Sequence, residues 1–428
     1  MIRISRRMAS GAAVMVACLA AVPLAVSSAS AAAPSAGTAG LVGSAGSAVG
    51  PNRDDAALRA ALQAVVNAGA TGAIGLVDDG TDVSAVAVGA ARLDPRRPLH
   101  VRDEVRVGSI TKSVIATITL QLVGEGRLQL GDTVERWLPG MVPNGTAITL
   151  RMLLNHTSGI FDYVNDADWH AAVLADPYRY WSPQELVAVG TAHPPAFAPG
   201  QGLAYSNTGY ILIGLVLEKV TGQPVQNLVL QRVVRPLHLH GTFFATSGRF
   251  RGPYAHGYFP PSLTGGGYLD VSSWPPSFAW TAGALVSTAP ELARFYQALL
   301  SGRLLSPMLL QAMTTTVTSP AFPGYGSGLG IFSLEMPCGT VWGHEGGIPG
   351  YLSIAVNDRS GSRSAVVLVP TEPDEAIGGA FAAAVATAAC QMVDHDLSRA
   401  SRSAAASSLA TRPLPAGPPA SSRLRPVG

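Results

Sequence analysis

A serine and a lysine three residues apart, Ser109 and Lys112, are the side chains in this chain best suited to covalent chemistry. Residues three apart share a face of a helix, so Lys112 would lie one turn beyond Ser109 on the same side. A largely buried helix starting near Ser109 is predicted, because apolar side chains recur at three- and four-residue steps: Val114, Ile115, Ile118 and Leu122. An ammonium group in a partly desolvated site has a lowered pKa and can take the proton of a serine hydroxyl. The pair therefore predicts a serine nucleophile with an amine base.

Lysine is rare in this sequence, which strengthens the interpretation of Lys112 as a functional residue. Of the 29 basic residues, 27 are arginine and two are lysine, Lys112 and Lys219. A guanidinium group stays protonated and cannot act as a base, so a lysine suggests a task that arginine cannot perform. Lys219 is interpreted as a solvated helix end. The S-x-x-K spacing also arises by chance, so the motif by itself is weak.

Two other short motifs carry polar side chains. Tyr205 and Asn207 lie on a predicted loop just before a helix that begins near Tyr210, where the alternative is a turn with an asparagine cap. His344 and Glu345 stand at the start of a predicted strand. The zinc motif H-E-x-x-H is excluded, because position 348 is isoleucine, and no metal site is predicted.

Together these motifs resemble those of the penicillin-recognising serine hydrolases. S-x-x-K is followed by Y-x-N 96 residues later and by H-x-G another 139 residues on, in place of the superfamily's S-D-N and K-T-G. The pattern is similar to the serine D-alanyl-D-alanine carboxypeptidase branch with its class C β-lactamase and esterase relatives, and most similar to the secreted carboxypeptidases of actinobacteria. The resemblance covers about residues 53 to 395 and includes residues 154–159, Cys338 and Cys390.

The resemblance implies a two-step acyl transfer on Ser109 without a cofactor. Lys112 and Tyr205 would share the proton transfers, and it stays open whether Lys112 deprotonates Ser109 or holds Tyr205 as a phenolate. Asn207 would bond the substrate's amide and steady Lys112. His344 stands where relatives use lysine.

The resemblance also implies the groups that hold the substrate. The backbone N–H groups of Ser109 and Gly347 would form an oxyanion hole, typically worth about 2.7–4 kcal/mol per donor. Gly346 and Glu345 would line the substrate site. Trp280 would line the cleft as an aromatic wall, with an ordinary core tryptophan as the alternative.

One part of the family pattern is missing. Carboxypeptidase-type relatives hold the substrate's terminal carboxylate with an arginine before the H-x-G strand and with threonines at its motif positions. Between Tyr325 and His344 there is no arginine or lysine, and Glu345 and Gly347 replace the threonines. We therefore expect weak selectivity for a terminal carboxylate.

Three functions remain open from the sequence. The first is a D-Ala-D-Ala carboxypeptidase that acts on peptidoglycan stem peptides and is acylated by β-lactams. The second is an esterase or D-amino-acid amidase of the same fold. The third is a non-catalytic sensor that binds β-lactams or peptidoglycan. The expected partner is in each case a small-molecule or peptide substrate.

The N-terminal segment predicts export. Residues 1–31 combine a basic start, an apolar run and the small-residue site Ala29-Ser30-Ala31, which indicates a cleaved secretory signal peptide. Residues 32–52 form a predicted flexible leader, and residues 396–428 a predicted disordered tail. We expect a secreted, extracellular monomer with no later transmembrane segment.

The remaining composition bears on cross-links and partners. Two cysteines remain after the signal, and in an exported protein they most simply pair, with two free buried thiols as the alternative. Between residues 53 and 396 the chain holds 21 basic and 27 acidic residues, a net charge of −6. That balance argues against a nucleic-acid partner.

The order of elements predicts an α+β fold. A helix is expected over 54–66, followed by an antiparallel hairpin of strands at 72–77 and 83–89. Helices should fill about 130–240, one of them opened by the Ser182 cap and Pro183. The sheet, spanning about 70–92 and 344–371, returns before a final helix over about 375–393. An antiparallel sheet flanked by helices should therefore face a mostly helical inserted subdomain across a cleft, within one domain of residues 53–395.

Overall fold

The computed structural model describes residues 54–393, and within them the α+β prediction is confirmed. A nine-stranded antiparallel sheet has the strand order β3-β2-β1-β14-β13-β12-β11-β10-β9. Segments from both ends of the described chain thus meet at its centre, where β1 pairs with β14. The predicted signal peptide, leader and C-terminal tail lie outside the described residues.

The strands of the large sheet are β1 (Gly72–Asp78), β2 (Val83–Arg92), β3 (Arg97–Pro98), β9 (Val317–Thr318), β10 (Tyr325–Ser327), β11 (Phe332–Met336), β12 (Gly339–Ile348), β13 (Tyr351–Asn357) and β14 (Ser364–Val369). Two small sheets combine β4 (Val105–Arg106), β8 (Leu285–Ser287) and β5 (Phe243–Phe244), and β6 (Tyr258–Phe259) with β7 (Leu269–Asp270).

The α-helices are α1 (Asp54–Asn67), α2 (Thr111–Gly124), α3 (Val134–Trp137), α4 (Leu150–Leu154), α5 (Ala167–Ala175), α6 (Pro183–Thr191), α7 (Asn207–Thr221), α8 (Val225–Val229), α9 (Pro261–Thr264), α10 (Trp280–Gly283), α11 (Ala289–Leu300), α12 (Pro307–Thr314) and α13 (Glu375–Val393). Helices α3 to α8 occupy the interval where the sequence predicts a helical insertion.

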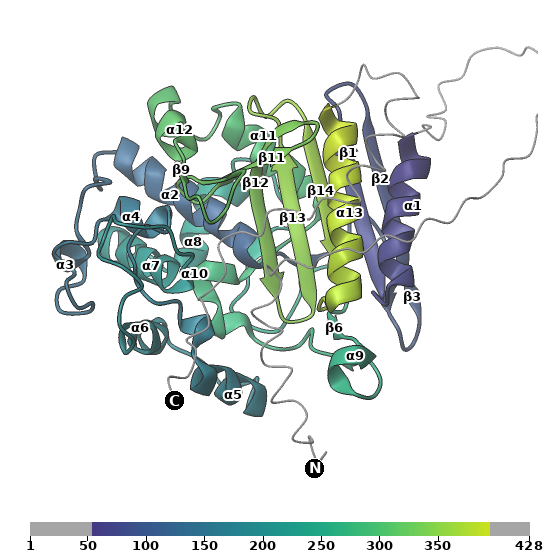
Figure 1. Cartoon of the computed structure of the whole chain (residues 1–428), viewed down its shortest axis with the longest axis horizontal. Coiled ribbons are helices and arrows are strands. Elements are labelled where there is room, and N and C mark those ends of the chain that lie inside the picture. Colours follow the sequence, from purple (N-terminus) through teal and green to yellow (C-terminus); the bar gives the residue numbers. More distant parts are fainter. Residues whose placement is uncertain (1–53, 394–428) are drawn as a thin grey trace, which may run out of the picture.

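Helices cover both faces of the sheet (Figure 1). α1 and α13 pack together on one face, where Leu58, Leu62 and Ile377 are fully buried against the strands. α11 packs on β13 and β14 from the other face. Every residue of β13 and β14 is buried, because a strand covered on both faces needs an apolar run rather than alternation.

The sequence predictions were correct for the first two and the last strands along the chain and missed strands between them. The β1–β2 hairpin has the predicted antiparallel pairing, with Gly72 opposite Gly89. β12 begins at Gly339, five residues before the predicted start of the strand, and β9 to β11 were not predicted. β9 and β10 are two and three residues long, too short for a period to be recognised.

Helix α13 corrects one prediction. The sequence interpretation found no segment after the signal that could span a bilayer, yet this 19-residue helix is long and apolar enough by length and composition. Half of it is buried inside the protein. It packs on α1 and β14, and its Cys390 forms a disulfide with Cys338, the residue just before β12. Its apolar composition therefore suits a helix that covers a sheet.

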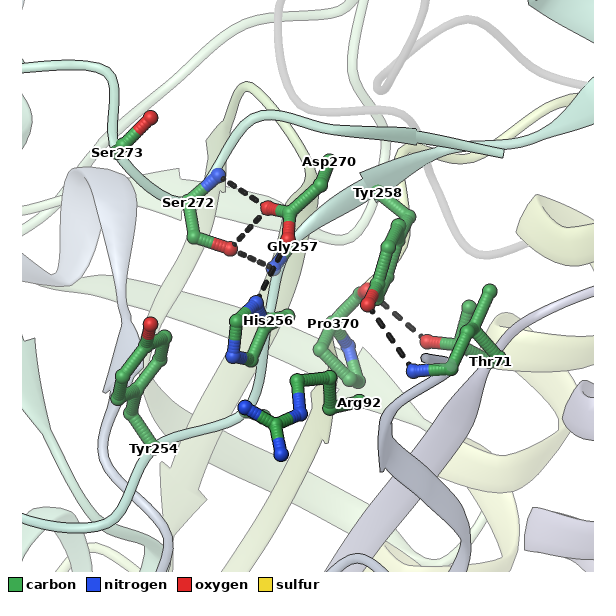
Figure 2. A network of polar contacts seen from close by, with 12 residues as sticks. Thr71, Arg92, Tyr254, His256, Gly257, Tyr258, Asp270, Ser272, Ser273 and Pro370 are labelled. Carbon is green, nitrogen blue, oxygen red and sulfur yellow. Dashed lines mark hydrogen bonds and ion pairs between the residues drawn. The ribbon is translucent and has the colours of Figure 1, made fainter. Parts of the chain in front are cut away.

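The β6–β7 hairpin is tied to its surroundings by Asp270 (Figure 2). One oxygen of the Asp270 carboxylate lies 2.6 Å from Nδ1 of His256, and the other accepts the Ser272 hydroxyl at 2.5 Å and the Ser272 N–H at 2.9 Å. Burial raises the pKa of Asp270, but the hydrogen bonds from His256 and Ser272 outweigh it and leave that pKa below its usual value.

This cluster gives a prediction for stability against pH. A folded-state pKa below the unfolded value of about 3.9 adds stability above that value, and this stability is lost as the pH falls through the folded pKa. Because the side chain is 42% exposed, D270N should lower the melting temperature by only about 1–3 °C at pH 7. Calorimetry at decreasing pH should show this difference shrink below the unfolded value and vanish once the carboxyl group is protonated in the folded wild type. An equal difference at every pH would contradict this account.

Candidate active site

Ser109 lies in a short 3-10 turn, Gly108–Ile110, that leads into α2. Gly108 has a φ of 48°, and a Cβ added there would meet the backbone of Gly347 at 2.6–2.8 Å. A Cβ added at Gly346 would come within 2.0 Å of the Val107 carbonyl oxygen and 3.0 Å of the Ser109 nitrogen. Glycines on both segments therefore let the backbone at Ser109 lie against β12.

The edge of β12 beside this turn is open. β11 pairs with β12 only as far as Gly343, and residues 344–348 pair with β13 on the other side alone among the described strands. Ser353 of β13 links the segment before the turn to this edge, because its hydroxyl lies within hydrogen-bond distance of two carbonyl oxygens, that of Val107 at 3.0 Å and that of Gly346 at 3.2 Å. The predicted oxyanion-hole residues Ser109 and Gly347 are thus brought side by side.

Lys112 is fully buried and points at three oxygens. Its Nζ lies 2.8 Å from Ser109 Oγ, 2.7 Å from Asn207 Oδ1 and 2.7 Å from the Ala282 carbonyl oxygen. Burial lowers the pKa of Lys112, against the charges of Asp162 and Glu345, which raise it. The predicted serine–lysine pair is therefore in hydrogen-bond contact, with an amine that gives up its proton more readily than an exposed lysine.

Tyr205 approaches Ser109 and Lys112 from the loop before α7. Its ring centroid lies 4.9 Å from Lys112 Nζ, and its interaction with the Ser109 side chain acts to lower its pKa. Its ring stacks on the ring of His156 at 4.2 Å between centroids. Burial raises the pKa of Tyr205 well above its usual value, so the phenol keeps its proton at neutral pH.

Asn207 is the first residue of α7, three positions earlier than the predicted helix start. Its side chain does not cap the helix, so the alternative interpretation as an asparagine cap was wrong. Its Oδ1 accepts from Lys112, and its Nδ2 donates to Asp162 at 2.9 Å.

His344 lies inside β12 rather than at its start, and it is buried. Its ring centroid lies 6.4 Å from that of Tyr205, in an edge-on arrangement. Nδ1 lies 2.6 Å from the carbonyl oxygen of Glu345, which makes it the protonated nitrogen. Burial and the charge of Lys112 lower the pKa of His344 to about 3, so the imidazole is neutral at physiological pH.

The charge of Glu345 acts on the same site. It raises the pKa of Lys112, Tyr205 and Tyr325. The side chain is half-buried, and burial raises its own pKa to about 7, against the opposing charge of Lys112. Glu345 is therefore an acid whose charge changes near neutral pH.

Trp280 is the first residue of α10, a short helix whose backbone contributes to the site. Its φ is 35°, a conformation unusual for a bulky residue. Its ring packs on α7, where a Cβ added to Gly214 would meet it at 2.6 Å. The same short helix α10 carries Ala282, whose carbonyl oxygen accepts from Lys112. The contacts of the ring therefore favour the core-tryptophan alternative.

Three groups at the site were missed from the sequence: the Ala282 carbonyl, His156 and Asp162. His156 has a φ of 63°, supports Tyr205 by stacking, and accepts the Ser206 N–H at Nδ1. Asp162 holds Asn207. The segment 154–159 had been noticed for its family likeness, which was the available signal for His156.

Chemically, the site joins a hydroxyl nucleophile, an amine that loses its proton readily, a protonated phenol and adjoining backbone N–H groups. These are the parts of an acyl-transfer site. The two groups able to move protons, Lys112 and Tyr205, both contact Ser109.

Comparisons with known proteins agree with this arrangement. The Beta-lactamase family model matches residues 58–388. The structure of a D-stereospecific amidohydrolase from Streptomyces sp. is similar, with a TM-score of 0.70 and 41% identity over 76% of this chain and 97% of that one. The D-amino acid amidase from Ochrobactrum anthropi SV3, complexed with D-phenylalanine, has a TM-score of 0.70 and 27% identity over 81% and 100%.

A curated relative points to the same group of proteins. Penicillin-binding protein 4* of Bacillus subtilis is 27% identical over 306 residues, which cover 67% of this chain and 65% of that protein. The chain spans less than two thirds of the length of the first curated relatives it matches. With a serine–lysine–tyrosine site on this fold, and a family match that spans most of its length, the chain belongs to the beta-lactamase family of serine hydrolases, homologous to the penicillin-binding proteins.

Proposed function

We propose that this protein is an exported serine amidohydrolase that hydrolyses amides of D-configured acyl groups and has little need for a terminal carboxylate. The observation that carries the proposal is the meeting of Ser109, Lys112 and Tyr205, on which the charge of Glu345 also acts. Ser109, Lys112 and Tyr205 supply the groups needed for acyl transfer. Glu345 stands where carboxypeptidase-type relatives carry a threonine.

In the first step Ser109 Oγ attacks the amide carbon, and neutral Lys112 takes its proton. The lowered pKa of Lys112 and the raised pKa of Tyr205 favour the amine over a phenolate as this base. The backbone N–H groups of Ser109 and Gly347 are proposed to hold the developing oxyanion.

Tyr205 then gives its proton to the leaving nitrogen as the carbon–nitrogen bond breaks, and Lys112 returns a proton to Tyr205. The acyl group stays on Ser109 and the amine leaves. Water repeats the sequence in reverse and releases the acid.

The substrate preference follows from charge. A terminal carboxylate near ionised Glu345 meets a like charge, and no arginine or lysine lies between Tyr325 and His344 to offset it. An amide or ester lacks that charge. The names of two similar structures, a D-stereospecific amidohydrolase and a D-amino acid amidase, support the same choice.

A second candidate is the D-Ala-D-Ala carboxypeptidase activity first expected from the sequence. The similarity to penicillin-binding protein 4* favours it. Export, common to both candidates, is supported by the signal-like residues 1–31 and by the Cys338–Cys390 disulfide.

The deciding experiment compares an N-acylated D-Ala-D-Ala peptide with its C-terminal amide. At pH 8, where Glu345 is ionised, we expect the amide to be hydrolysed at least as fast as the free acid. E345Q should raise kcat/KM for the acid by about tenfold, or ~1.4 kcal/mol, and leave the amide nearly unaffected. At pH 6 the wild-type discrimination should shrink, because Glu345 is then protonated.

A hundredfold or greater preference for the free acid would establish the carboxypeptidase instead. The corresponding L-Ala amide tests stereochemistry. S109A, together with intact-mass detection of a penicillin adduct, separates enzymatic turnover from background.

A further inference from the structure

Asp162 carries a buried carboxylate that contacts Asn207, which in turn contacts Lys112. It is 3% exposed and lies in the loop that leads into the turn Tyr163–Asn165. Its carboxylate accepts the backbone N–H of Asn207 at 3.0 Å and the Asn207 side-chain Nδ2 at 2.9 Å. A carboxylate is costly to bury unless it is paired and hydrogen-bonded, so its position calls for a reason.

The first reason concerns the direction of an amide. The two ends of an asparagine side chain have nearly the same shape but opposite hydrogen-bonding character. An ionised carboxylate only accepts, so Asp162 binds the NH2 end of Asn207. The oxygen end must then face Lys112, where it lies 2.7 Å from Nζ. Asp162 thereby selects which end of Asn207 meets the catalytic amine.

The second reason concerns charge. Burial raises the pKa of Asp162, and the charge of Lys112 together with the hydrogen bonds from Asn207 opposes that rise. In return, the Asp162 charge raises the pKa of Lys112 against the effect of burial. The other titratable groups coupled to Lys112 are Glu345 on β12, His156, and His344.

We propose that Asp162 is a positioning residue that orients Asn207 and, through it, sets the direction and protonation of Lys112. The inference rests on the proposed role of Lys112 as base. Asp162 itself does not touch the nucleophile. Its contribution passes through a contact between residues 45 positions apart, from a segment that the sequence interpretation did not connect with the site.

The test uses three variants of the full chain. D162N removes the charge and puts an NH2 group opposite the NH2 of Asn207. The double variant D162N/N207D exchanges the partners: the amide introduced at position 162 can donate to the carboxylate introduced at position 207, which still accepts from Lys112. D166N is the matched control, because Asp166 also caps a helix in this loop, at Trp169 N, and pairs with His193 instead of Asn207.

The first readout does not depend on activity. Because the chain has two lysines, labelling with [ε-13C]lysine gives two NMR signals, which K219R assigns. We expect D162N to lower the Lys112 titration midpoint by about one pH unit, D166N to leave it in place, and the double variant to return it to or above the wild-type value.

The second readout is the rate at which Ser109 is acylated by a p-nitrophenyl ester, followed against pH. D162N should slow acylation by roughly tenfold or more and move its acid limb to lower pH, and the exchanged pair should recover much of the rate. D162E keeps the negative charge but changes the distance to Asn207. It should therefore keep the Lys112 titration midpoint and lower the rate of Ser109 acylation.

An unchanged Lys112 midpoint in D162N, or a rate loss matched by D166N, would overturn the inference and leave Asp162 as a loop cap. If wild-type Ser109 is not acylated at all, the proposed function fails, while the NMR titration still decides the role of Asp162.

Discussion

Replacement of Lys112 by arginine should slow acylation of Ser109 by about three orders of magnitude, within the range expected for loss of a general base. Arginine keeps the positive charge and can donate to Asn207 and Ala282, but its guanidinium group cannot accept the Ser109 proton. Nζ of Lys112 lies 2.8 Å from Oγ, so no other group needs to move for the transfer.

The measurement is the release of p-nitrophenol from an ester substrate, with intact mass to detect the acyl-enzyme. K219R is a matched control, because Lys219 is the other lysine and is exposed on the last turn of α7. It should retain wild-type activity. Activity in K112R within tenfold of wild type would exclude Lys112 as the base and leave Tyr205 as the candidate.

Replacement of Gly346 by alanine should lower kcat by about 10²–10³, the loss expected when one oxyanion donor is displaced. The added Cβ would come within 2.0 Å of the Val107 carbonyl oxygen, a distance at which the backbone must shift. That shift moves β12 away from the Ser109 turn, so the N–H groups of Ser109 and Gly347 no longer point at one oxygen.

G131A is the control, since a Cβ at Gly131 meets nothing within 4 Å. Thermal unfolding of both variants separates loss of the fold from loss of the oxyanion hole. A transition-state analogue such as a boronic acid should bind G346A more weakly in proportion to the loss in kcat. Full activity in a folded G346A protein would mean that the oxyanion is held elsewhere.

The sequence alone was sufficient where the determining interactions are local. Ser109 and Lys112 meet because three residues of helical backbone span one turn. Likewise, α6 begins at the predicted serine cap, where Ser182 and Glu185 form a reciprocal capping box. The β1–β2 hairpin follows from a five-residue polar loop between two β-rich runs.

The tertiary structure decided whatever depends on residues far apart in the chain. The Ala282 carbonyl meets Lys112 across 170 residues, and Asp162 meets Asn207 across 45. No local period encodes such contacts, because they arise only when segments far apart in the chain pack together.

The sequence by itself thus indicated the proposed nucleophile, its amine partner and the order of the motifs, because a short backbone segment or a family pattern carries each of them. Only the folded chain decided how burial changes the pKa values of the groups at the site. Lys112 and His344 are buried and Glu345 is half-buried, and the loss of hydration lowers the pKa of the two bases and raises that of the acid. Burial is a property of the whole packed structure, which is why the protonation states of this site could not be derived from the residue types alone.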